Sequence, residues 1–445
     1  VGRMSSYLAL LMFPALMTLI IAGFPIAFSM ILVATGFGII QFGDVAAYQL
    51  LTKIEDTASN SILAAVPLFI FMGAMLERSG IAERLFEAIH MWTRRLPGGL
   101  GIGAIILGTL FAASSGVVGA TEAVIGMLAI PVMLKHQYSK SLMSGTICAS
   151  GSLGTAIPPS ITVVVLGPVA GVSVGSLFSG LLIPGFLMAV MFLIYIIGIA
   201  YLKPEMAPRI QEQEPDIALG EKLRITLVAL VPTMLLIFTV LGTILLGMAT
   251  PTEAAACGAL GAIILAAAYR NLNVAVLWTS AVKTVNISAM ILLIVMGGSM
   301  FAGVFFASGG MATVQALLMD TGLSPWMILG LILLIAFIAG FVLDLISVVL
   351  IIIPVAMPIV RMLGFDEIWF CVAFLVVLQT SYLTPPLAPA IFYLRAITPP
   401  EVTLKHMYKG VVPFILAQLV VLALVLAFPE IALWLPDVMG GPSWR

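Results

Sequence analysis

The sequence predicts an all-α polytopic membrane protein built from two inverted repeats, each with one re-entrant hairpin and one broken transmembrane helix. Three observations lead to this fold class: an apolar composition, a repeated spacing of proline pairs, and an unequal distribution of arginines between the two halves. Hydrophobic residues make up 62% of the chain and charged residues 9%, with a mean hydropathy of +1.21. A water-soluble core cannot accommodate that composition, so most of the surface must face lipid.

Apolar stretches long enough to cross a bilayer recur along the chain. A spanning helix needs about 20 mostly apolar residues, and such stretches run from Tyr7 to Glu430. They predict spans at 7–22, 25–41, 61–77, 178–202, 225–248, 249–269, 285–307 and 410–430, broken spans at 140–172 and 366–397, and re-entrant hairpins at 98–134 and 325–362.

A repeated proline spacing divides the chain into two related halves. Pro131 is followed 27 residues later by the pair Pro158 and Pro159, and Pro358 is followed 27 residues later by Pro385 and Pro386. The two sets are offset by 227 residues. The halves are therefore about 25–202 and 251–430, and the polar segment 203–224 between them is predicted to be a linker.

Arginine placement indicates that the repeats are inverted. Segment 78–95 carries four arginines, whereas its counterpart 308–325 carries no Lys or Arg. Because Lys and Arg accumulate on the cytoplasmic side, we expect the first segment inside and the second outside, both as in-plane arm helices. Counted over the whole chain, fifteen basic residues fall inside and four outside. Inverted repeats are typical of alternating-access transporters.

The proline pairs mark the breaks in two membrane helices. Proline lacks an N–H and clashes with the carbonyl four residues before it. The first pair should therefore free the carbonyls of Gly154 and Thr155, and the second pair those of Ser381 and Tyr382. In hydrocarbon a free carbonyl must line a cavity or meet a ligand. Two such breaks at equivalent places predict a binding site near the bilayer midplane.

Small polar residues at the hairpin tips add further oxygen atoms. Ser114, Ser115 and Gly116 lie at the first tip, and Asp344 lies at the second. Oxygen ligands are what a hard cation such as Na⁺ requires. We interpret Asp344 as a cation-site or gating residue, whereas Glu122, early in the returning helix, fits a structural and a functional role equally.

A third carboxylate and several absent motifs narrow the function. Thr250, Pro251 and Glu253 form a capping-box pattern, so we expect Glu253 to begin a helix. The net charge of −1 leaves no nucleic-acid footprint. The chain has no phosphate-binding GxxxxGK[ST] loop and no nucleophile, base and metal constellation. We therefore expect neither ATP hydrolysis nor any other enzymatic activity.

Several stretches resemble the large membrane subunit of tripartite ATP-independent periplasmic (TRAP) transporters, the DctM-like family. The matching stretches are SSGVVGATEA (114–123), GSLGTAIPPSI (151–161), LFSGLLIPGF (177–186), ATPTEAAACGA (249–259), FVLDLISVVLIIIPVAMPIV (341–360) and QTSYLTPPLAP (379–389). They occur in family order over nearly the whole chain.

The resemblance implies an elevator-type transporter with a fixed scaffold and a moving transport domain. Scaffold helices and the first arm would occupy 1–97. The transport domain would comprise 98–172 and 325–397. Further scaffold helices, with the linker 203–224 and the second arm, would occupy 173–324, and a C-terminal scaffold helix and tail 398–445.

The resemblance also implies two sodium sites. The first would use Ser115 with backbone atoms of Gly154, Ile157 and Pro158. The second would use the Asp344 tip with Leu383 and Thr384. Candidate substrate contacts are Ser114, Thr121, Ser160, Thr380 and Arg395. For Arg395 an alternative is an ordinary cytoplasmic arginine that snorkels to the membrane surface.

Partners and location follow from the same resemblance. We expect a multi-pass protein of the bacterial inner membrane that works with a separate small membrane subunit and a periplasmic substrate-binding protein. Its substrate would be a small organic acid, such as a keto or hydroxy acid. A stand-alone divalent-anion/Na⁺ symporter is the alternative, and a channel is a third reading that the scarcity of charge in the spans disfavours.

Overall fold

The protein is described by a computed structural model that covers residues 8–116, 118–209, 218–320 and 322–439, without the side chains of 115, 118, 120 and 319. All regular elements in these ranges are helical. Eight helical segments are long and apolar enough to cross a membrane: Ser61–Arg78, Lys140–Ala170, Val174–Leu202, Leu219–Leu245, Pro251–Ala268, Val274–Ala307, Leu345–Met362 and Leu404–Ala427. The predicted polytopic all-α class is confirmed.

The first half of the chain carries the first repeat. Its elements are α2 (Met12–Ile21), α3 (Ile26–Phe42), α4 (Val45–Ala58), the 3₁₀ turn η1 (Ser61–Ala64), α5 (Ala65–Arg78), α6 (Ile81–Thr93), α7 (Gly99–Ser115), α8 (Val118–Lys135), α9 (Lys140–Ala156), α10 (Ile161–Ala170), α11 (Val174–Leu202) and the turn η2 (Pro204–Met206). α7 and α8 form the first predicted hairpin, and α9 and α10 the first broken helix.

The second half repeats this order. Its elements are α12 (Leu219–Ile237), the π-helical turn η3 (Phe238–Gly242), α13 (Thr243–Leu245), α14 (Pro251–Ala268), α15 (Val274–Ala307), α16 (Gly310–Asp320), α17 (Pro325–Ala339), α18 (Leu345–Met362), α19 (Glu367–Leu383), α20 (Pro389–Ile397), α21 (Leu404–Ala427) and α22 (Glu430–Met439). α17 and α18 form the second hairpin, and α19 and α20 the second broken helix.

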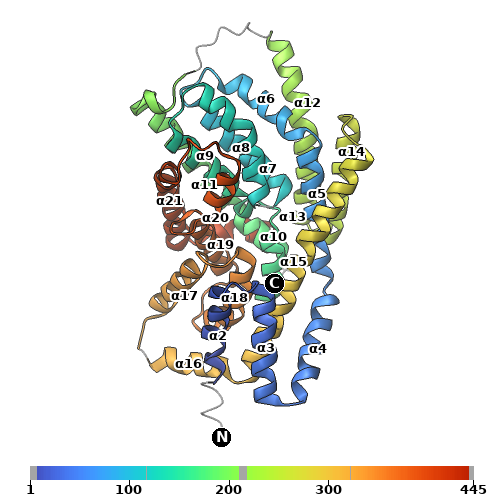
Figure 1. The fold of residues 1–445 in the computed structure, drawn as a ribbon, viewed down its shortest axis with the longest axis vertical. Coiled ribbons are helices and arrows are strands. Elements are labelled where there is room, and N and C mark those ends of the chain that lie inside the picture. Colours follow the sequence, from blue (N-terminus) through green and yellow to red (C-terminus); the bar gives the residue numbers. More distant parts are fainter. Residues whose placement is uncertain (1–7, 117, 210–217, 321, 440–445) are drawn as a thin grey trace.

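The two arms lie at opposite ends of the molecule. Figure 1 shows α6 near the end that also holds the start of α12, and α16 at the other end, beside α2. The first hairpin enters from the end of α6 and the second from the end of α16. This is the inverted arrangement that the arginine distribution predicts.

One scaffold span differs from the prediction. The apolar pattern places a connection at 42–60 and a span at 285–307. Instead α4 continues into η1 and α5, and α15 is one unbroken helix of 34 residues. The segment from Val45 to Arg78 and the helix from Val274 to Ala307 are equivalent in the two halves. A helix that is broken beside Asn60 in the first repeat is therefore continuous in the second.

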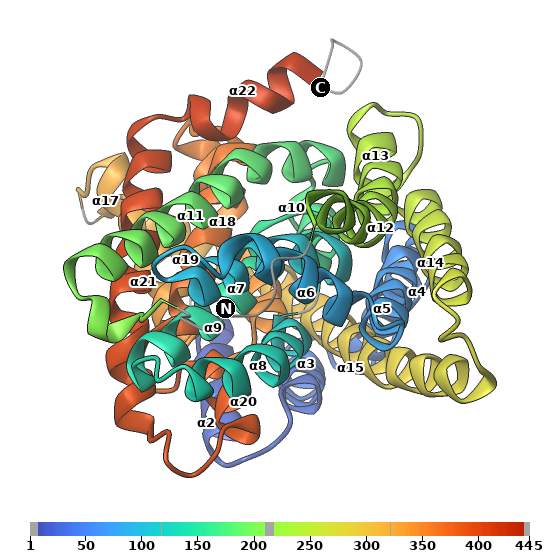
Figure 2. The same cartoon turned by 90° about the horizontal axis from the view of Figure 1, so that it is seen from above.

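The helices form two groups when the molecule is seen from above. Figure 2 shows α4, α5, α12, α13, α14 and α15 on one side, and the hairpins and broken helices on the other. Long helix α11 packs against α7, α9 and α19, and α21 packs most extensively against α9. Both therefore lie with the hairpins and broken helices.

The surface of these helices is suited to lipid. On α11 the exposed large side chains Phe186, Val190 and Ile194 recur every four residues and so form one stripe. In water such a stripe would be an aggregation hazard. In a bilayer it faces a solvent as apolar as itself.

The start of α14 has the predicted cap. The Thr250 hydroxyl accepts a hydrogen bond from the Glu253 N–H at 3.3 Å, and the Thr250 N–H donates to Glu253 Oε2 at 2.8 Å. Both halves of a capping box are present, with Pro251 at the first helical position. Glu253 is thus explained by helix initiation.

Candidate functional site

Each hairpin tip touches the broken helix of its own repeat. At the first tip Gly116 has a φ of +61°, and a Cβ there would lie 2.7 Å from the carbonyl oxygen of Pro159. At the second tip a Cβ on Gly340 would lie 2.9 Å from Cβ of Ser381. Glycine at both tips therefore lets the tip approach the break more closely than any other residue allows.

The first break leaves carbonyl oxygens without helical partners. α9 ends where the Ile157 N–H donates to the Leu153 carbonyl at 2.9 Å. In the described part of the chain no hydrogen bond reaches the carbonyls of Gly154 or Thr155. The predicted oxygen donors of the first break are therefore available for a ligand.

The second break is only partly as predicted. The sequence predicts a free Ser381 carbonyl, but this oxygen accepts a hydrogen bond from the Thr384 N–H at 3.0 Å. The last turn of α19 tightens from an i to i+4 to an i to i+3 pattern and so satisfies it. Both proline pairs, 158–159 and 385–386, are joined by cis peptide bonds.

The two broken helices meet at a local twofold axis. Gln379 Nε2 donates to Ser152 Oγ at 3.4 Å, and these residues are 227 positions apart, which is the repeat offset. A residue that contacts its own equivalent lies beside the axis that relates the two repeats. Gln418 of α21 also donates to Ser152 Oγ, at 3.5 Å. These contacts join α9 to α19 and α21 about one turn before the breaks.

A cavity of about 280 Å³ joins both tips, both broken helices and α15. This volume is near the lower end of the roughly 300–1,000 Å³ typical of small-molecule sites. The residues that line it are Gly116, Gly119, Ile161, Thr162, Ile287, Met290, Ile291, Phe341, Val342, Leu343, Asp344, Leu345, Ile346, Tyr382, Pro389 and Tyr393. We call it the tip cavity. It lies where the sequence predicts a binding site.

The first predicted sodium ligands are close together. Gly154, Ile157 and Pro158 are buried at the end of α9, and the adjacent Pro159 carbonyl contacts the hairpin tip at Gly116. The side chain of Ser115 is outside the described residues. The backbone oxygens present are of the type that a hard cation takes, so this group fits a sodium ion chemically.

The second predicted set is more dispersed. Asp344 caps α18, since its Oδ2 accepts from the N–H groups of Ile346 at 3.1 Å and Ser347 at 3.2 Å. The Ser347 hydroxyl donates to the other carboxylate oxygen. Asp344 lines the tip cavity, whereas Leu383 and Thr384 do not. A cation role for Asp344 must therefore coexist with its role as a helix cap.

The predicted substrate contacts differ in their free hydrogen-bonding capacity. The Ser114 and Thr380 hydroxyls donate to carbonyls of their own helices at 2.9 and 2.8 Å. Thr121 is fully buried. Ser160 is fully buried at the first break, and its hydroxyl has no hydrogen-bond partner among the described residues. Of these four hydroxyls, that of Ser160 is the one most in need of a ligand.

Arg395 lies away from the tip cavity. Arg395 is an exposed residue at the end of α20, and its Nη1 donates to the Val402 carbonyl at 2.6 Å. It does not line the cavity. The geometry agrees with the alternative in which Arg395 is an ordinary surface arginine.

The structure adds the side chains of two tyrosines, of which the proline pattern points only to the backbone carbonyl of Tyr382. Tyr382 Oη donates to Glu122 Oε2 at 3.4 Å, which joins the second broken helix to the first hairpin. Glu122 is fully buried, and its Oε1 has no hydrogen-bond partner among the described residues. Tyr393 lines the tip cavity and contacts Gly119. The only feature of the sequence that points to this group of side chains is Glu122, a carboxylate at membrane depth.

Comparison with known families gives one match that covers most of the chain. Residues 13–431 match the model described as "Tripartite ATP-independent periplasmic transporter, DctM component". The match includes both hairpins, both broken helices and every residue that lines the tip cavity.

Individual relatives give the same result. The chain is 31% identical to the C4-dicarboxylate TRAP transporter large permease protein DctM of Pseudomonas aeruginosa, over 90% of this chain and 92% of that protein. It is 29% identical to the sialic acid TRAP transporter large permease protein SiaM of Vibrio cholerae, over 95% and 97%. Among solved structures, the Alcanivorax borkumensis YdaH transporter has a TM-score of 0.60 at 15% identity, covering 91% of this chain and 98% of that one. This last likeness concerns the fold alone.

Proposed function

Because the chain belongs to the DctM component family of TRAP transporters, we propose that it is the large permease subunit of a sodium-coupled importer of a small organic acid. It is a multi-pass protein of the bacterial inner membrane and a transporter subunit, not an enzyme. The observation that carries the proposal is the meeting of two hairpin tips and two broken helices around one cavity.

Sodium coupling is supported by the kind of ligand present at the tips and breaks. The free carbonyls of Gly154 and Thr155 are oxygen donors in a buried place, and breaks of this type hold coupling ions in other secondary transporters. The described residues contain no group of three or more His, Cys, Asp or Glu side chains that could hold a metal ion. Backbone and hydroxyl oxygens suit Na⁺ better than a transition metal.

An organic acid is supported by the relatives and by the size of the cavity. The two relatives above are named for C4-dicarboxylate and for sialic acid, both of which are carboxylates. The tip cavity of about 280 Å³ fits a small solute. Hydroxyl and backbone groups at the breaks can hydrogen-bond to a carboxylate without a fixed counter-charge.

Elevator movement is supported by the two groups of helices. We assign the hairpins α7–α8 and α17–α18 and the broken helices α9–α10 and α19–α20 to the moving unit. Because α11 and α21 pack against these helices, we assign them to the same unit, whereas the sequence resemblance puts 173–202 and 398–430 in the scaffold. The scaffold is then α3 to α5 and α12 to α15.

Removing oxygen ligands from both proposed sodium sites tests the coupling. Uptake by the complete transporter in proteoliposomes should need an inward Na⁺ gradient and should be abolished by Ser115→Ala combined with Asp344→Asn. Asparagine is as good a helix cap as aspartate, so the second change removes charge while keeping the start of α18. Na⁺ dependence unchanged from the wild type in the double variant would refute the assignment.

Omitting the periplasmic partner tests the tripartite assembly. We propose that substrate reaches this chain only from a binding protein docked on its outer side, where arm segment 308–325 carries no Lys or Arg. Uptake of free substrate should therefore stay at background until the binding protein is added. Full-rate uptake without that protein would instead identify a stand-alone symporter.

A further inference from the structure

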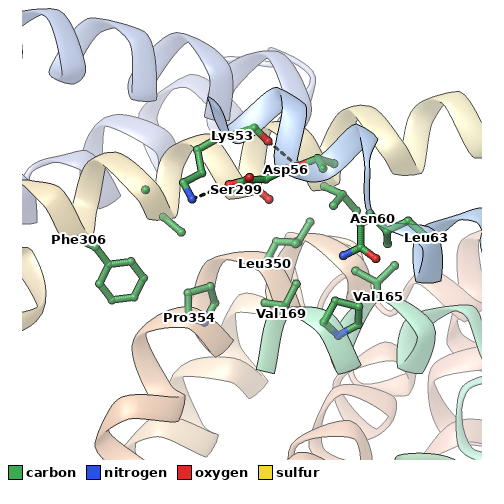
Figure 3. Close-up of a pocket in the computed structure, with 16 residues that line it drawn as sticks. Lys53, Asp56, Asn60, Leu63, Val165, Val169, Ser299, Phe306, Leu350 and Pro354 are labelled. Atoms are coloured by element: carbon green, nitrogen blue, oxygen red, sulfur yellow. Dashed lines mark hydrogen bonds and ion pairs between the residues drawn. The ribbon is translucent and has the colours of Figure 1, made fainter. Parts of the chain in front are cut away.

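A second cavity lies between the scaffold and the proposed moving unit. Its volume is also about 280 Å³. Figure 3 shows α4 and α15 along one wall and α10 and α18 along the other. In Figure 1, α4 lies toward the end that carries α16 and away from the arginine-bearing α6, which is the predicted outer side. We call this space the outer cavity.

The two walls of the outer cavity differ in polarity. Lys53, Asp56 and Asn60 line it from the scaffold, together with Ser299 of α15. The opposite wall is apolar and includes Val165, Val169, Leu350 and Pro354. In Figure 3 the Lys53 ammonium and the Asn60 side-chain amide both point into the space between the walls. An amphipathic solute with one charged end would satisfy both walls.

The aliphatic stem of Lys53 packs against α15. A Cβ on Gly303 of α15 would lie 3.3 Å from both Cγ and Cε of Lys53, so the aliphatic chain rests on that glycine. The ammonium contacts Asp56 at 3.1 Å, and the two side chains are 42% and 59% exposed. An ion pair this exposed contributes little free energy. Lys53 can therefore exchange Asp56 for another carboxylate at small cost.

The two cavities differ in the charged side chains that line them. The tip cavity is lined by Asp344 and by no described Lys or Arg, whereas the outer cavity contains Lys53 paired with Asp56. Arg361 is already engaged, since it donates to both oxygens of Glu367 at 2.8 and 2.7 Å and to the Ala170 carbonyl at 3.1 Å. An organic anion that enters the outer cavity can therefore pair with the Lys53 ammonium.

One face of α15 lines both cavities. Ile287 and Ile291 line the tip cavity, and Val295, Gly298 and Ala302 line the outer cavity. These positions are three or four residues apart, so they lie in one row along the helix. Both cavities therefore lie along the same face of α15.

We propose that Lys53, with Asn60, forms a capture site that binds a carboxylate of the substrate before the substrate reaches the tip cavity. The inference rests on the proposed function in taking an organic acid as the substrate. With one ammonium, one amide and an apolar wall, the site recognises the carboxylate and not the rest of the solute. Its selectivity among carboxylates should be low.

Equilibrium dialysis tests the capture site without transport. Purified complex of the large and small subunits is dialysed against radiolabelled succinate, pyruvate or N-acetylneuraminate in a potassium buffer without Na⁺, so that sodium-dependent sites stay empty. We expect carboxylate binding that weakens about tenfold in Lys53→Gln, about the worth of one charge-assisted contact, and that persists in Lys53→Arg. Asp56→Asn should strengthen binding. The diamide of succinic acid should not bind.

Lys140→Gln is the matched control. Lys140 forms an ion pair with Glu401 at 3.0 Å, also partly exposed, and lines neither cavity. The Lys140→Gln variant should bind each probe as the wild type does. Gly303→Ala keeps the charge and requires the Lys53 stem to move by only a few tenths of an ångström, so it should weaken binding less than Lys53→Gln does. No binding to the wild type, or equal binding by wild type and Lys53→Gln, would overturn the proposal.

A transport arm separates this proposal from the proposed function. In proteoliposomes with the binding protein, Lys53→Gln should lower the initial uptake rate about tenfold at low ionic strength, and less in high salt because screening weakens steering by charge. A wild type that takes up no carboxylate would contradict the proposed function, while dialysis would still decide the capture site. The dialysis contains no binding protein, so any occupant of the site must be the small carboxylate. It therefore also distinguishes that occupant from an acidic side chain of a docked partner.

Discussion

Gly116→Val is expected to lose sodium-driven uptake by at least about a hundredfold, the loss that a displacement of roughly 1 Å causes in a positioned site. Gly116 has a φ of +61°, where a β-branched residue is a genuine outlier. Its Cβ would also lie 2.7 Å from the Pro159 carbonyl oxygen. The first hairpin tip must then separate from the first break. Initial uptake in proteoliposomes measures the effect.

Gly330→Val is the control for that substitution. Gly330 belongs to α17 of the second hairpin and is exposed. A Cβ at this position would have open space around it, with no described heavy atom within 4 Å outside its own helix and chain neighbours. The same change of residue should therefore leave uptake close to wild type. Size-exclusion profiles of both detergent-solubilised variants would establish that each is folded. Wild-type uptake by Gly116→Val would contradict the contact between tip and break.

The equivalent contact in the second repeat permits a rescue. A side chain at 340 meets Ser381, so Gly340→Ala alone should impair uptake. Adding Ser381→Gly removes the obstructing side chain and should restore much of the activity. Neighbouring residues that share a contact are expected to be non-additive in this way. An impairment that Ser381→Gly does not relieve would indicate that the tip acts through another contact.

The features that could be predicted from sequence are those repeated at a fixed offset. Proline pairs predict both breaks because proline disrupts a helix wherever it lies. The contact between Ser152 and Gln379 shows that the offset of 227 is also a relation in space. α6 carries arginine and α16 carries no Lys or Arg, and the two helices lie at opposite ends of the molecule. This agrees with the predicted inversion of the repeats. Each of these features can be recognised from one segment or from a comparison of two segments, so a single sequence is enough to predict it.

The features that could not be predicted depend on which surfaces meet. Asp344 at a hairpin tip could be a ligand or a cap, and only the hydrogen bonds from Ile346 and Ser347 show that it is a cap. The Glu122 and Tyr382 pair joins segments from different repeats. Likewise, nothing in the apolar pattern of α11 or α21 distinguishes a scaffold helix from a helix packed on the broken spans. Only tertiary packing separates these alternatives.

Elevator movement is expected to change distances between the two units while leaving distances within a unit fixed. Three pairs of exposed positions suit spin labels attached to cysteine: Met127 with Leu334, Leu334 with Ile264, and Met127 with Leu416. Met127 of α8 and Leu334 of α17 both lie in the proposed moving unit, so their separation should be the same in all states. Ile264 of α14 belongs to the scaffold.

The pair from Leu334 to Ile264 should change by many ångströms between sodium-free protein and protein with Na⁺, substrate and binding protein. An elevator carries its site across much of a hydrocarbon layer roughly 30 Å thick, and ligands shift the populations only as far as the two states differ in affinity. The pair from Met127 to Leu416 decides where α21 belongs: a fixed separation places it in the moving unit, and a changing one places it in the scaffold. If the separation of Leu334 and Ile264 is unaltered by every ligand, local gating at the hairpin tips replaces the elevator.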